Sequence, residues 1–149
     1  MYIMRMKKKG LQLNRSYDDF LLGSPITMWE NLPHSVEKYT EPEEWYCYYF
    51  NAINKKEIEV WCENGIIDAI CCRISCIFKG NELIKMNFQV FLDLIEEKPS
   101  SHDIVYVVVT KDRGQNQHVY EFDKSGLQIW VWRNKICTVI IRNSKDDEE

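Results

Sequence analysis

The chain has 149 residues and a formal net charge of −4, with 19 Lys and Arg against 23 Asp and Glu. A chain of this length can bury enough surface to fold without a metal or disulfide framework. Its 45% hydrophobic and 13% aromatic content excludes disordered and collagen-like classes, and its acidic balance disfavours nonspecific nucleic-acid binding. We therefore expect one domain over residues 1–149 that binds no nucleic acid.

The hydrophobic pattern predicts the compartment. No apolar run approaches the roughly 20 residues of a membrane-spanning helix, and Met1 to Gly10 lack the apolar core of a secretory signal. We expect a cytoplasmic protein that does not contact a membrane. In that reducing compartment the six cysteines are expected to be free thiols.

The first predicted element is a helix, because apolar residues recur at spacings of 4, 3 and 3, which places them on one helical face. The same spacing returns in the second half of the chain. The first set is Leu22, Ile26, Trp29 and Leu32, and the second is Ile84, Phe88, Phe91 and Leu94. Each set precedes a group of strands, so a helix is predicted at the start of each half.

The strongest local signal is a β-hairpin around Asn64-Gly65, a pair that favours the positive φ angles of a type I′ turn. If Glu63 pairs with Ile66, then Cys62 pairs with Ile67 and Trp61 with Asp68. This register puts one set of side chains on the buried face and another on a solvated face. The buried set is Val60, Cys62, Ile67 and Ala69, and the solvated set is Glu59, Trp61, Glu63 and Asp68.

The second half begins with an amphipathic helix over Phe88 to Glu97, which starts near Asn87 and ends at Lys98-Pro99 because proline restricts the residue before it. A strand over Ile104 to Val109 follows. A second hairpin has Arg133-Asn134 at its turn, with strands Leu127 to Trp132 and Ile136 to Ile141. Both faces of this hairpin are apolar, which predicts a central, covered position.

An internal repeat relates the two halves. Ile58 to Ile70 aligns without a gap with Leu127 to Val139, 69 residues later, and Tyr48-x-Phe50 corresponds to Tyr120-x-Phe122. Helices that precede groups of sequential strands are typical of α+β proteins. We therefore predict an α+β fold, a single domain with two pseudo-symmetric helix-plus-antiparallel-strand halves. The repeats run over about 20–80 and 82–142, and 143–149 forms an acidic tail.

Two clusters of side chains are candidates for metal binding or catalysis. Cys71 and Cys72 are adjacent on a strand and point to opposite faces, which disfavours a zinc site formed with Cys62 and Cys76. His102 and His118 offer an acid and a base for RNA cleavage, with Lys111 or Arg113 at the phosphate, but no nucleophile signature accompanies them. We predict no enzyme activity, no catalytic residue, no cofactor and no metal.

Carboxylates beside large aromatic rings are the more informative feature, because aromatic anchors bind partners and acidic side chains steer basic ones. The first hairpin is acidic where the second is apolar. We predict that a basic partner contacts Glu41, Glu43, Glu44, Glu57, Glu59, Glu63 and Asp68.

Three stretches of the chain carry a resemblance to a known class. They are Trp61-x-x-Asn64-Gly65-x-Ile67-x-x-Ile70, Phe78-Lys79-Gly80-Asn81-x-Leu83-Ile84 and Tyr120-x-Phe122-x3-Gly126-Leu127-x-Ile129-Trp130. This pattern resembles small bacterial immunity proteins of polymorphic-toxin and contact-dependent growth-inhibition systems. The resemblance implies a cytoplasmic protein that binds and neutralises a cognate toxin C-terminal domain, such as a nuclease. It assigns no binding residue.

Two alternatives stay open at this stage. The first is a ligand-binding sensor or adaptor with a groove between its two halves. The second is a hydrolase that uses a cysteine or a histidine. Co-purification with the product of an adjacent gene favours the immunity interpretation, whereas a bound small molecule or activity without a partner favours the alternatives.

Overall fold

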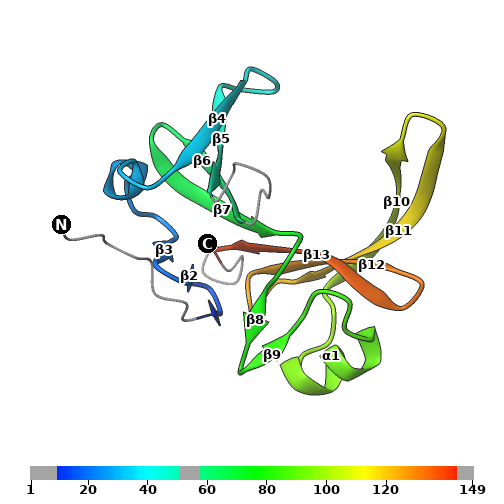
Figure 1. Ribbon diagram of the computed structural model, residues 1–149. Helices are drawn as coiled ribbons and strands as arrows, with labels where there is room; N and C mark the ends of the chain where they lie inside the picture. The colour runs from blue at the N-terminus through cyan, green and yellow to red at the C-terminus, as the bar shows by residue number, and fades with distance from the viewer. Residues whose placement is uncertain (1–9, 51–57, 144–149) are drawn as a thin grey trace.

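The computed structural model describes residues 10–50 and 58–143, and an antiparallel eight-stranded sheet dominates it (Figure 1). The order of strands across the sheet is β10-β11-β12-β13-β7-β6-β5-β4. These strands are β4 (His34–Tyr39), β5 (Trp45–Phe50), β6 (Ile58–Glu63), β7 (Ile66–Cys72), β10 (Ser101–Thr110), β11 (Arg113–Phe122), β12 (Leu127–Trp132) and β13 (Lys135–Arg142).

The smaller elements pack on one face of this sheet. They are β1 (Leu11–Gln12), β2 (Ser16–Tyr17), β3 (Phe20–Leu21), the 3₁₀ helix η1 (Ile26–Trp29), β8 (Ile77–Phe78), β9 (Asn81–Glu82) and α1 (Phe88–Ile95). Aromatic contacts join β3 and α1 to the sheet. Phe20 of β3 lies 4.7 Å from Phe50, and Phe91 of α1 lies 5.5 Å from Phe122, measured between ring centroids. The main hydrophobic core therefore lies between the sheet and these elements.

The α+β prediction is wrong. Strands make up 56% of the structure, and α1 is the one α-helix in the described part of the chain. The predicted helix of the first half is only the single turn η1, because Pro25 precedes it and Pro33 follows closely, and both prolines restrict the residues before them. The halves are thus not helix-plus-strand units.

The second predicted helix forms, and its start is confirmed. Asn87 caps it, since its side-chain oxygen accepts hydrogen bonds from the backbone N–H groups of Gln89 (2.9 Å) and Val90 (3.4 Å). The helix ends earlier than predicted, because Glu96 adopts the left-handed conformation at the C-cap.

The two central hairpins share one pairing pattern. In β6–β7, Trp61 pairs with Ala69 and Cys62 with Ile67; in β12–β13, the residues 69 positions later pair in the same way. The strands β7 and β13 then pair with each other, with Cys71 opposite Ile140 at the centre. Both hairpins therefore have the same register and meet at a local two-fold relationship. The repeat boundaries at 20–80 and 82–142 stay a prediction.

The segment before each helix also contacts its hairpin in an equivalent way. Gly23 N–H donates to the Ile67 carbonyl (2.8 Å), and Lys85 N–H donates to the Ile136 carbonyl (2.7 Å). Each returning bond is present as well, from Ile67 N–H to Ser24 and from Ile136 N–H to Met86. These bonds fix η1 and α1 at corresponding ends of their hairpins.

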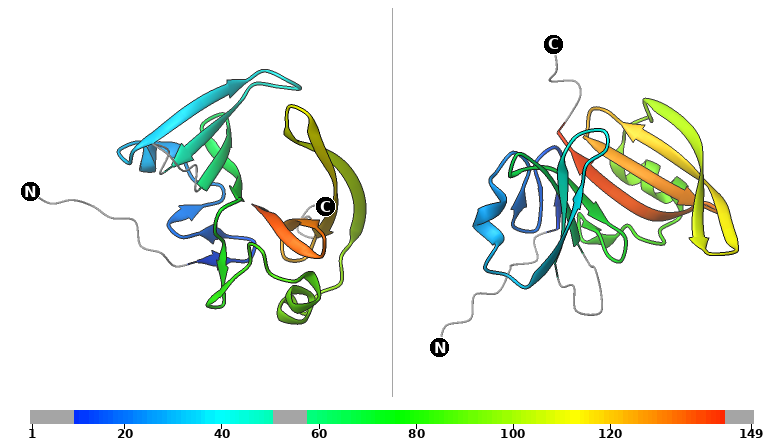
Figure 2. Two further views of the ribbon diagram at one scale, coloured as in Figure 1. Left: turned by 45° about the vertical axis from the view of Figure 1, so that its right-hand side comes forward. Right: turned by 90° about the horizontal axis from the view of Figure 1, so that it is seen from above.

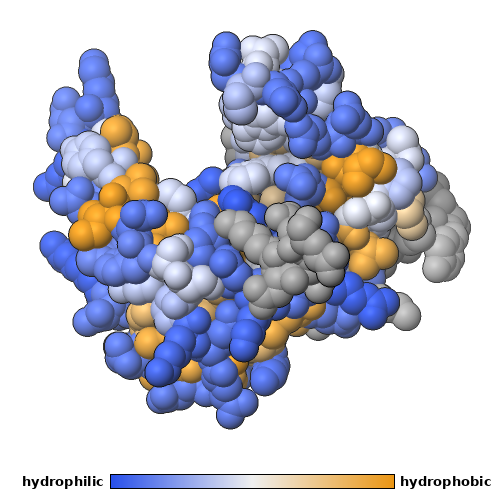
Figure 3. Space-filling view, turned by 180° about the vertical axis from the view of Figure 1, so that it is seen from behind, coloured by the Kyte–Doolittle hydropathy of each residue, from blue (hydrophilic) through white to orange (hydrophobic). Residues whose placement is uncertain are grey.

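The ends of the sheet project from the body of the molecule. The hairpins β4–β5 and β10–β11 rise on the same side, opposite α1, with β13 and β7 between their bases (Figure 2). Their tips stand apart in the space-filling view, and apolar surface follows one of the projections (Figure 3). The exposed apolar side chains of β10 are Ile104, Val105, Tyr106, Val108 and Val109.

Candidate binding site

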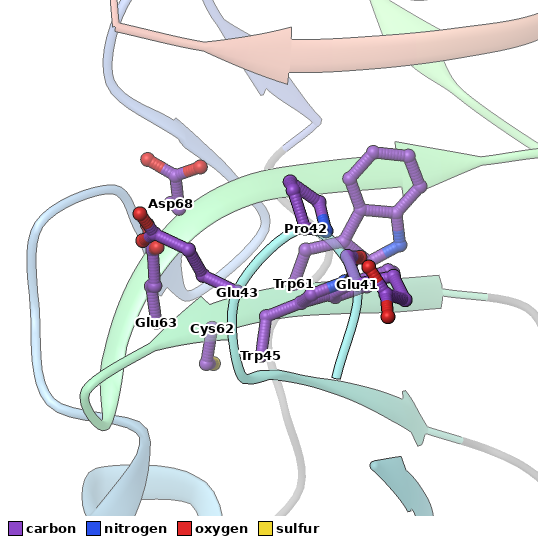
Figure 4. Close-up of a pocket in the computed structure, with 8 residues that line it drawn as sticks. All are labelled: Glu41, Pro42, Glu43, Trp45, Trp61, Cys62, Glu63 and Asp68. Carbon is purple, nitrogen blue, oxygen red and sulfur yellow. Dashed lines mark hydrogen bonds between the residues drawn. The ribbon is translucent and has the colours of Figure 1, made fainter. Parts of the chain in front are cut away.

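A pocket of about 420 Å³ lies where the turn between β4 and β5 meets the turn end of the β6–β7 hairpin (Figure 4). Its lining combines carboxylates with tryptophans. The lining residues are Glu41, Pro42, Glu43, Trp45, Trp61, Cys62, Glu63 and Asp68. Pockets of this size hold small ligands or single protruding side chains of a partner.

The aromatic part of the pocket is built by strand pairing. Trp61 lies between Cys47 of β5 and Ala69 of β7, and these two small buried residues leave room for the indole. Trp45 contacts the Trp61 ring at 5.8 Å between centroids and stacks on Tyr39 at 4.3 Å. Because the Trp45 indole N–H also donates to the Glu41 carbonyl (3.2 Å), the turn holds this ring in place.

Four carboxylates surround these rings, and all four were among the predicted partner contacts. Glu43, Glu63 and Asp68 gather at one end of the pocket, and Glu41 lies at the other (Figure 4). Asp68 reaches this position through a β-bulge: the pairing jumps from Cys62–Ile67 to Trp61–Ala69 and leaves Asp68 unpaired between them. The pocket therefore concentrates negative charge beside π faces.

The crowding of the carboxylates changes the pKa of Glu63. The protonated Glu63 carboxyl group donates a hydrogen bond to Glu43, which raises the pKa of Glu63, and desolvation and repulsion by Glu43 and Asp68 raise it further. Like charges that crowd one site disfavour ionisation, whereas a bound cation relieves the repulsion. The arrangement is thus suited to a lysine or arginine side chain, which carboxylates and tryptophan faces both attract.

The bulge also corrects the predicted register. The pairs Glu63–Ile66 and Cys62–Ile67 are confirmed, but Trp61 pairs with Ala69 instead of Asp68. Ala69 consequently lies on the face of Trp61, in a small cluster with Cys71 and Ile140, and not with Val60 and Cys62. Trp130 packs against the same cluster from the second half.

Three of the predicted contacts lie outside the pocket. Glu44 points away from it, where it forms an ion pair with Lys38 (3.7 Å) and accepts a hydrogen bond from the Tyr46 hydroxyl group (2.8 Å). Glu57 falls outside the described residues. Glu59 is described, and its position contradicts the expectation of a solvated carboxylate.

Glu59 is buried, with 6% of its surface exposed, and Arg73 donates to it from Nε at 2.5 Å. A buried carboxylate is stable only when it is paired and hydrogen-bonded, and Arg73 meets that requirement. The alternation of side chains along the strand predicts that Glu59 lies on a polar face. It does not reveal that Arg73, just beyond the end of β7, covers Glu59 and forms an ion pair with it. Glu59 is therefore a structural residue.

The histidines weighed for catalysis do come together. His102 Nε2 lies 2.7 Å from His118 Nδ1, and both rings stack in a column with Tyr120. Lys111, however, lies at the tip of the hairpin, nine residues after His102, and Arg113 lies five residues before His118, or roughly 17 Å along an extended strand. The structure thus separates the histidine pair from its proposed phosphate contacts.

The cysteines are free thiols in the structure. Cys71 and Cys72 face opposite sides of the sheet, as predicted, since they belong to different hydrophobic clusters. Burial raises the pKa of Cys47 to about 11 and that of Cys71 to about 12, which keeps both thiols protonated at neutral pH. Among the described residues, no three His, Cys, Asp or Glu side chains are grouped as metal ligands.

The sequence predicts the carboxylates of the pocket and places large aromatic rings beside them, with Trp61 on the solvated face. It does not predict that Trp45 and Trp61 form one aromatic wall. A signal was present, because Tyr39 and Trp45 flank a turn of five residues and so pair across it. In the described residues we find no helix with the length and apolar character to cross a membrane. No protein-family model, curated protein or solved structure matches the chain.

Proposed function

We propose that this protein binds a basic protein partner through the acidic-aromatic pocket and neutralises it, in the manner of a bacterial immunity protein that blocks a cognate toxin domain in the cytoplasm. The observation that supports this best is the convergence of Glu41, Glu43, Glu63 and Asp68 on Trp45 and Trp61. In this proposal the chain acts by occupying its partner and not by catalysis.

The chemistry of the pocket favours a protruding lysine or arginine of the partner. A cation over a tryptophan face gains about 0.5–2 kcal/mol, depending on how far it is desolvated. Charge-assisted hydrogen bonds to the carboxylates add to this and fix its orientation. A nuclease domain is a suitable partner, because proteins that bind nucleic acid carry basic surfaces, and opposite charges accelerate association.

The sensor alternative, with a ligand between the halves, has less support. The seam between the halves is the β7–β13 pairing, and its central side chains Cys71 and Ile140 are buried between Trp61 and Trp130. Binding at the pocket requires no rearrangement of that cluster.

Co-expression with the product of the adjacent gene, as the candidate toxin, tests the proposal. We expect the chain to restore growth and to co-purify with the domain as a stable complex. The variant Glu43→Lys with Glu63→Lys should lose protection, because it reverses the charge of the pocket without touching the core. The control Glu30→Lys with Asp93→Lys makes the same change in net charge at exposed positions elsewhere and should protect fully. Protection by both variants would contradict the assignment of the pocket.

A further inference from the structure

A second pocket, of about 500 Å³, lies at the turn of the β12–β13 hairpin, in the half of the molecule that the proposed function does not use. Its lining residues come from the end of β7, the segment before α1 and the hairpin itself. They are Arg73, Ile84, Lys85, Trp132, Arg133, Lys135, Ile136 and Cys137. Four of the eight are cations and none is a carboxylate, although the whole chain is acidic.

This basic pocket occupies the place in the second hairpin that the acidic pocket occupies in the first. At the positions of Glu63 and Asp68 it has Trp132 and Cys137, in the same register. Arg133 and Asn134 form the turn with positive φ angles, as Asn64 and Gly65 do. One backbone arrangement therefore carries an acidic site at one end of the sheet and a basic site at the other.

Contacts orient two of the basic side chains and position the backbone of a third. The guanidinium group of Arg133 lies over the Trp132 ring, 4.4 Å from its centroid. The Arg73 guanidinium is oriented by Glu59, which accepts from Nε. The backbone N–H of Lys85 donates to the Ile136 carbonyl (2.7 Å), which holds the Lys85 segment against β13. The side chains of Arg73 and Arg133 are therefore preorganised, which lowers the entropic cost of binding a ligand.

Cations beside an exposed aromatic ring are suited to one class of small ligand. Arginine and lysine side chains bind phosphate through charge-assisted hydrogen bonds, and tryptophan stacks on planar bases irrespective of their sequence. Trp132 is half-exposed, while Ile84 and Ile136 give the pocket an apolar floor. We propose that this pocket binds a nucleotide, with its phosphate on the Arg133, Lys135 and Lys85 side chains and its base against the face of Trp132 that Arg133 does not cover.

The pocket volume is in the range of small-ligand sites, from about 300 to 1,000 Å³. The nucleotide site is separate from the acidic-aromatic pocket, so either site can exist without the other. An acidic segment of a protein offers carboxylates but no planar ring, so it leaves Trp132 unused and is the competing outcome.

Isothermal titration of the full chain with AMP at low ionic strength tests the proposal, with inorganic phosphate and adenosine as separate probes. We expect one AMP per chain, bound at least about tenfold more tightly than either fragment, because stacking and charge act together. A polyglutamate peptide serves as the competing probe. If it binds as tightly as AMP, or if AMP fails to bind at millimolar concentration, the nucleotide assignment is wrong.

Two variants assign the binding to this pocket. Arg133→Asn with Lys135→Gln should weaken AMP binding by about tenfold or more. Lys111→Gln with Arg113→Gln removes the same charge at the tip of β10–β11 and should leave the affinity unchanged. Equal losses in both would mean nonspecific attraction and would overturn the proposal.

A third variant separates the two parts of the ligand. Trp132→Leu keeps all four cations, so it should reduce the affinity for AMP but leave the affinity for inorganic phosphate unchanged. Circular dichroism verifies that each variant is folded. If Trp132→Leu is folded and binds AMP as the wild type does, the base does not stack on Trp132 and the proposal fails.

Discussion

Asp68 and Cys137 hold the same position in the two halves of the sheet: each is the unpaired residue of a bulge, in β7 and β13 respectively, and each lines the pocket beside its hairpin. A bulge adds a residue to one strand and redirects the side chains beside it. The same backbone feature thus delivers a carboxylate to one pocket and a thiol to the other. The two pockets therefore differ in their side chains on a repeated backbone frame.

The close approach of Gly126 to β13 gives the first prediction. Gly126 has φ +68°, and a Cβ there would lie 2.2 Å from the carbonyl oxygen of Arg142, whereas a Cβ at Gly65, with φ +75°, would meet nothing within 4 Å. Gly65→Ala should therefore cost only about 1–2 kcal/mol for the left-handed conformation. Gly126→Ala should cost more in urea unfolding, since backbone atoms must move. An equal loss of unfolding free energy in the two variants would show that the β13 backbone at Arg142 moves aside at little cost.

The buried Glu59–Arg73 pair gives the second prediction. Glu59→Gln removes the charge from the buried member of the pair and weakens its hydrogen bond with Arg73, whose side chain is 53% exposed, and should reduce the free energy of unfolding by about 1–3 kcal/mol. Glu44→Gln removes a surface ion pair, 58% exposed on the glutamate side, and should change it by less than about 1 kcal/mol. Denaturant melts of both variants at neutral pH measure the difference. A similar small effect at both positions would mean that the burial of Glu59 is not energetically important.

The raised pKa of Glu63 gives the third prediction. A carboxyl group whose pKa is higher in the folded than in the unfolded state stabilises the fold most below its unfolded pKa, and this contribution is lost as pH rises through the folded pKa. Glu63→Gln should therefore raise the melting temperature at neutral pH, and the gain should shrink as the pH falls toward about 4. A gain that is the same at both pH values would exclude repulsion from Glu43 and Asp68 as its cause.

Thiol reactivity gives the fourth prediction. Burial raises the pKa of Cys47, Cys62, Cys71 and Cys137, and a hydrogen bond with Cys76 together with burial raises that of Cys72. Cys137 is half-exposed, whereas the other five cysteines are buried. In the native protein a disulfide reagent should modify Cys137 first and the others only on unfolding. Cys137→Ser should remove the fast phase. If that phase survives in the variant, one of the buried cysteines becomes accessible in the folded state.

Much of the first hairpin could be predicted from its sequence, because Asn64-Gly65 fixes the turn and the turn fixes the first pairs. The bulge at Asp68 could not, since alternation of side chains does not reveal an extra residue. The first helix was predicted from apolar spacing alone, which η1 satisfies over one turn. The burial of Glu59 depends on Arg73, which is 14 residues away in the chain, so it cannot be predicted from the residues next to Glu59.

The salt dependence of binding to the co-purified partner tests the central claim most directly, with wild type compared to Glu43→Gln with Glu63→Gln. Ionic screening weakens attraction between exposed charges. The account predicts that the variant binds at least about tenfold more weakly at low salt and that the two affinities converge at high salt. Affinities that are equal at low salt, or that differ by the same factor at every salt concentration, would contradict a cation in the acidic-aromatic pocket.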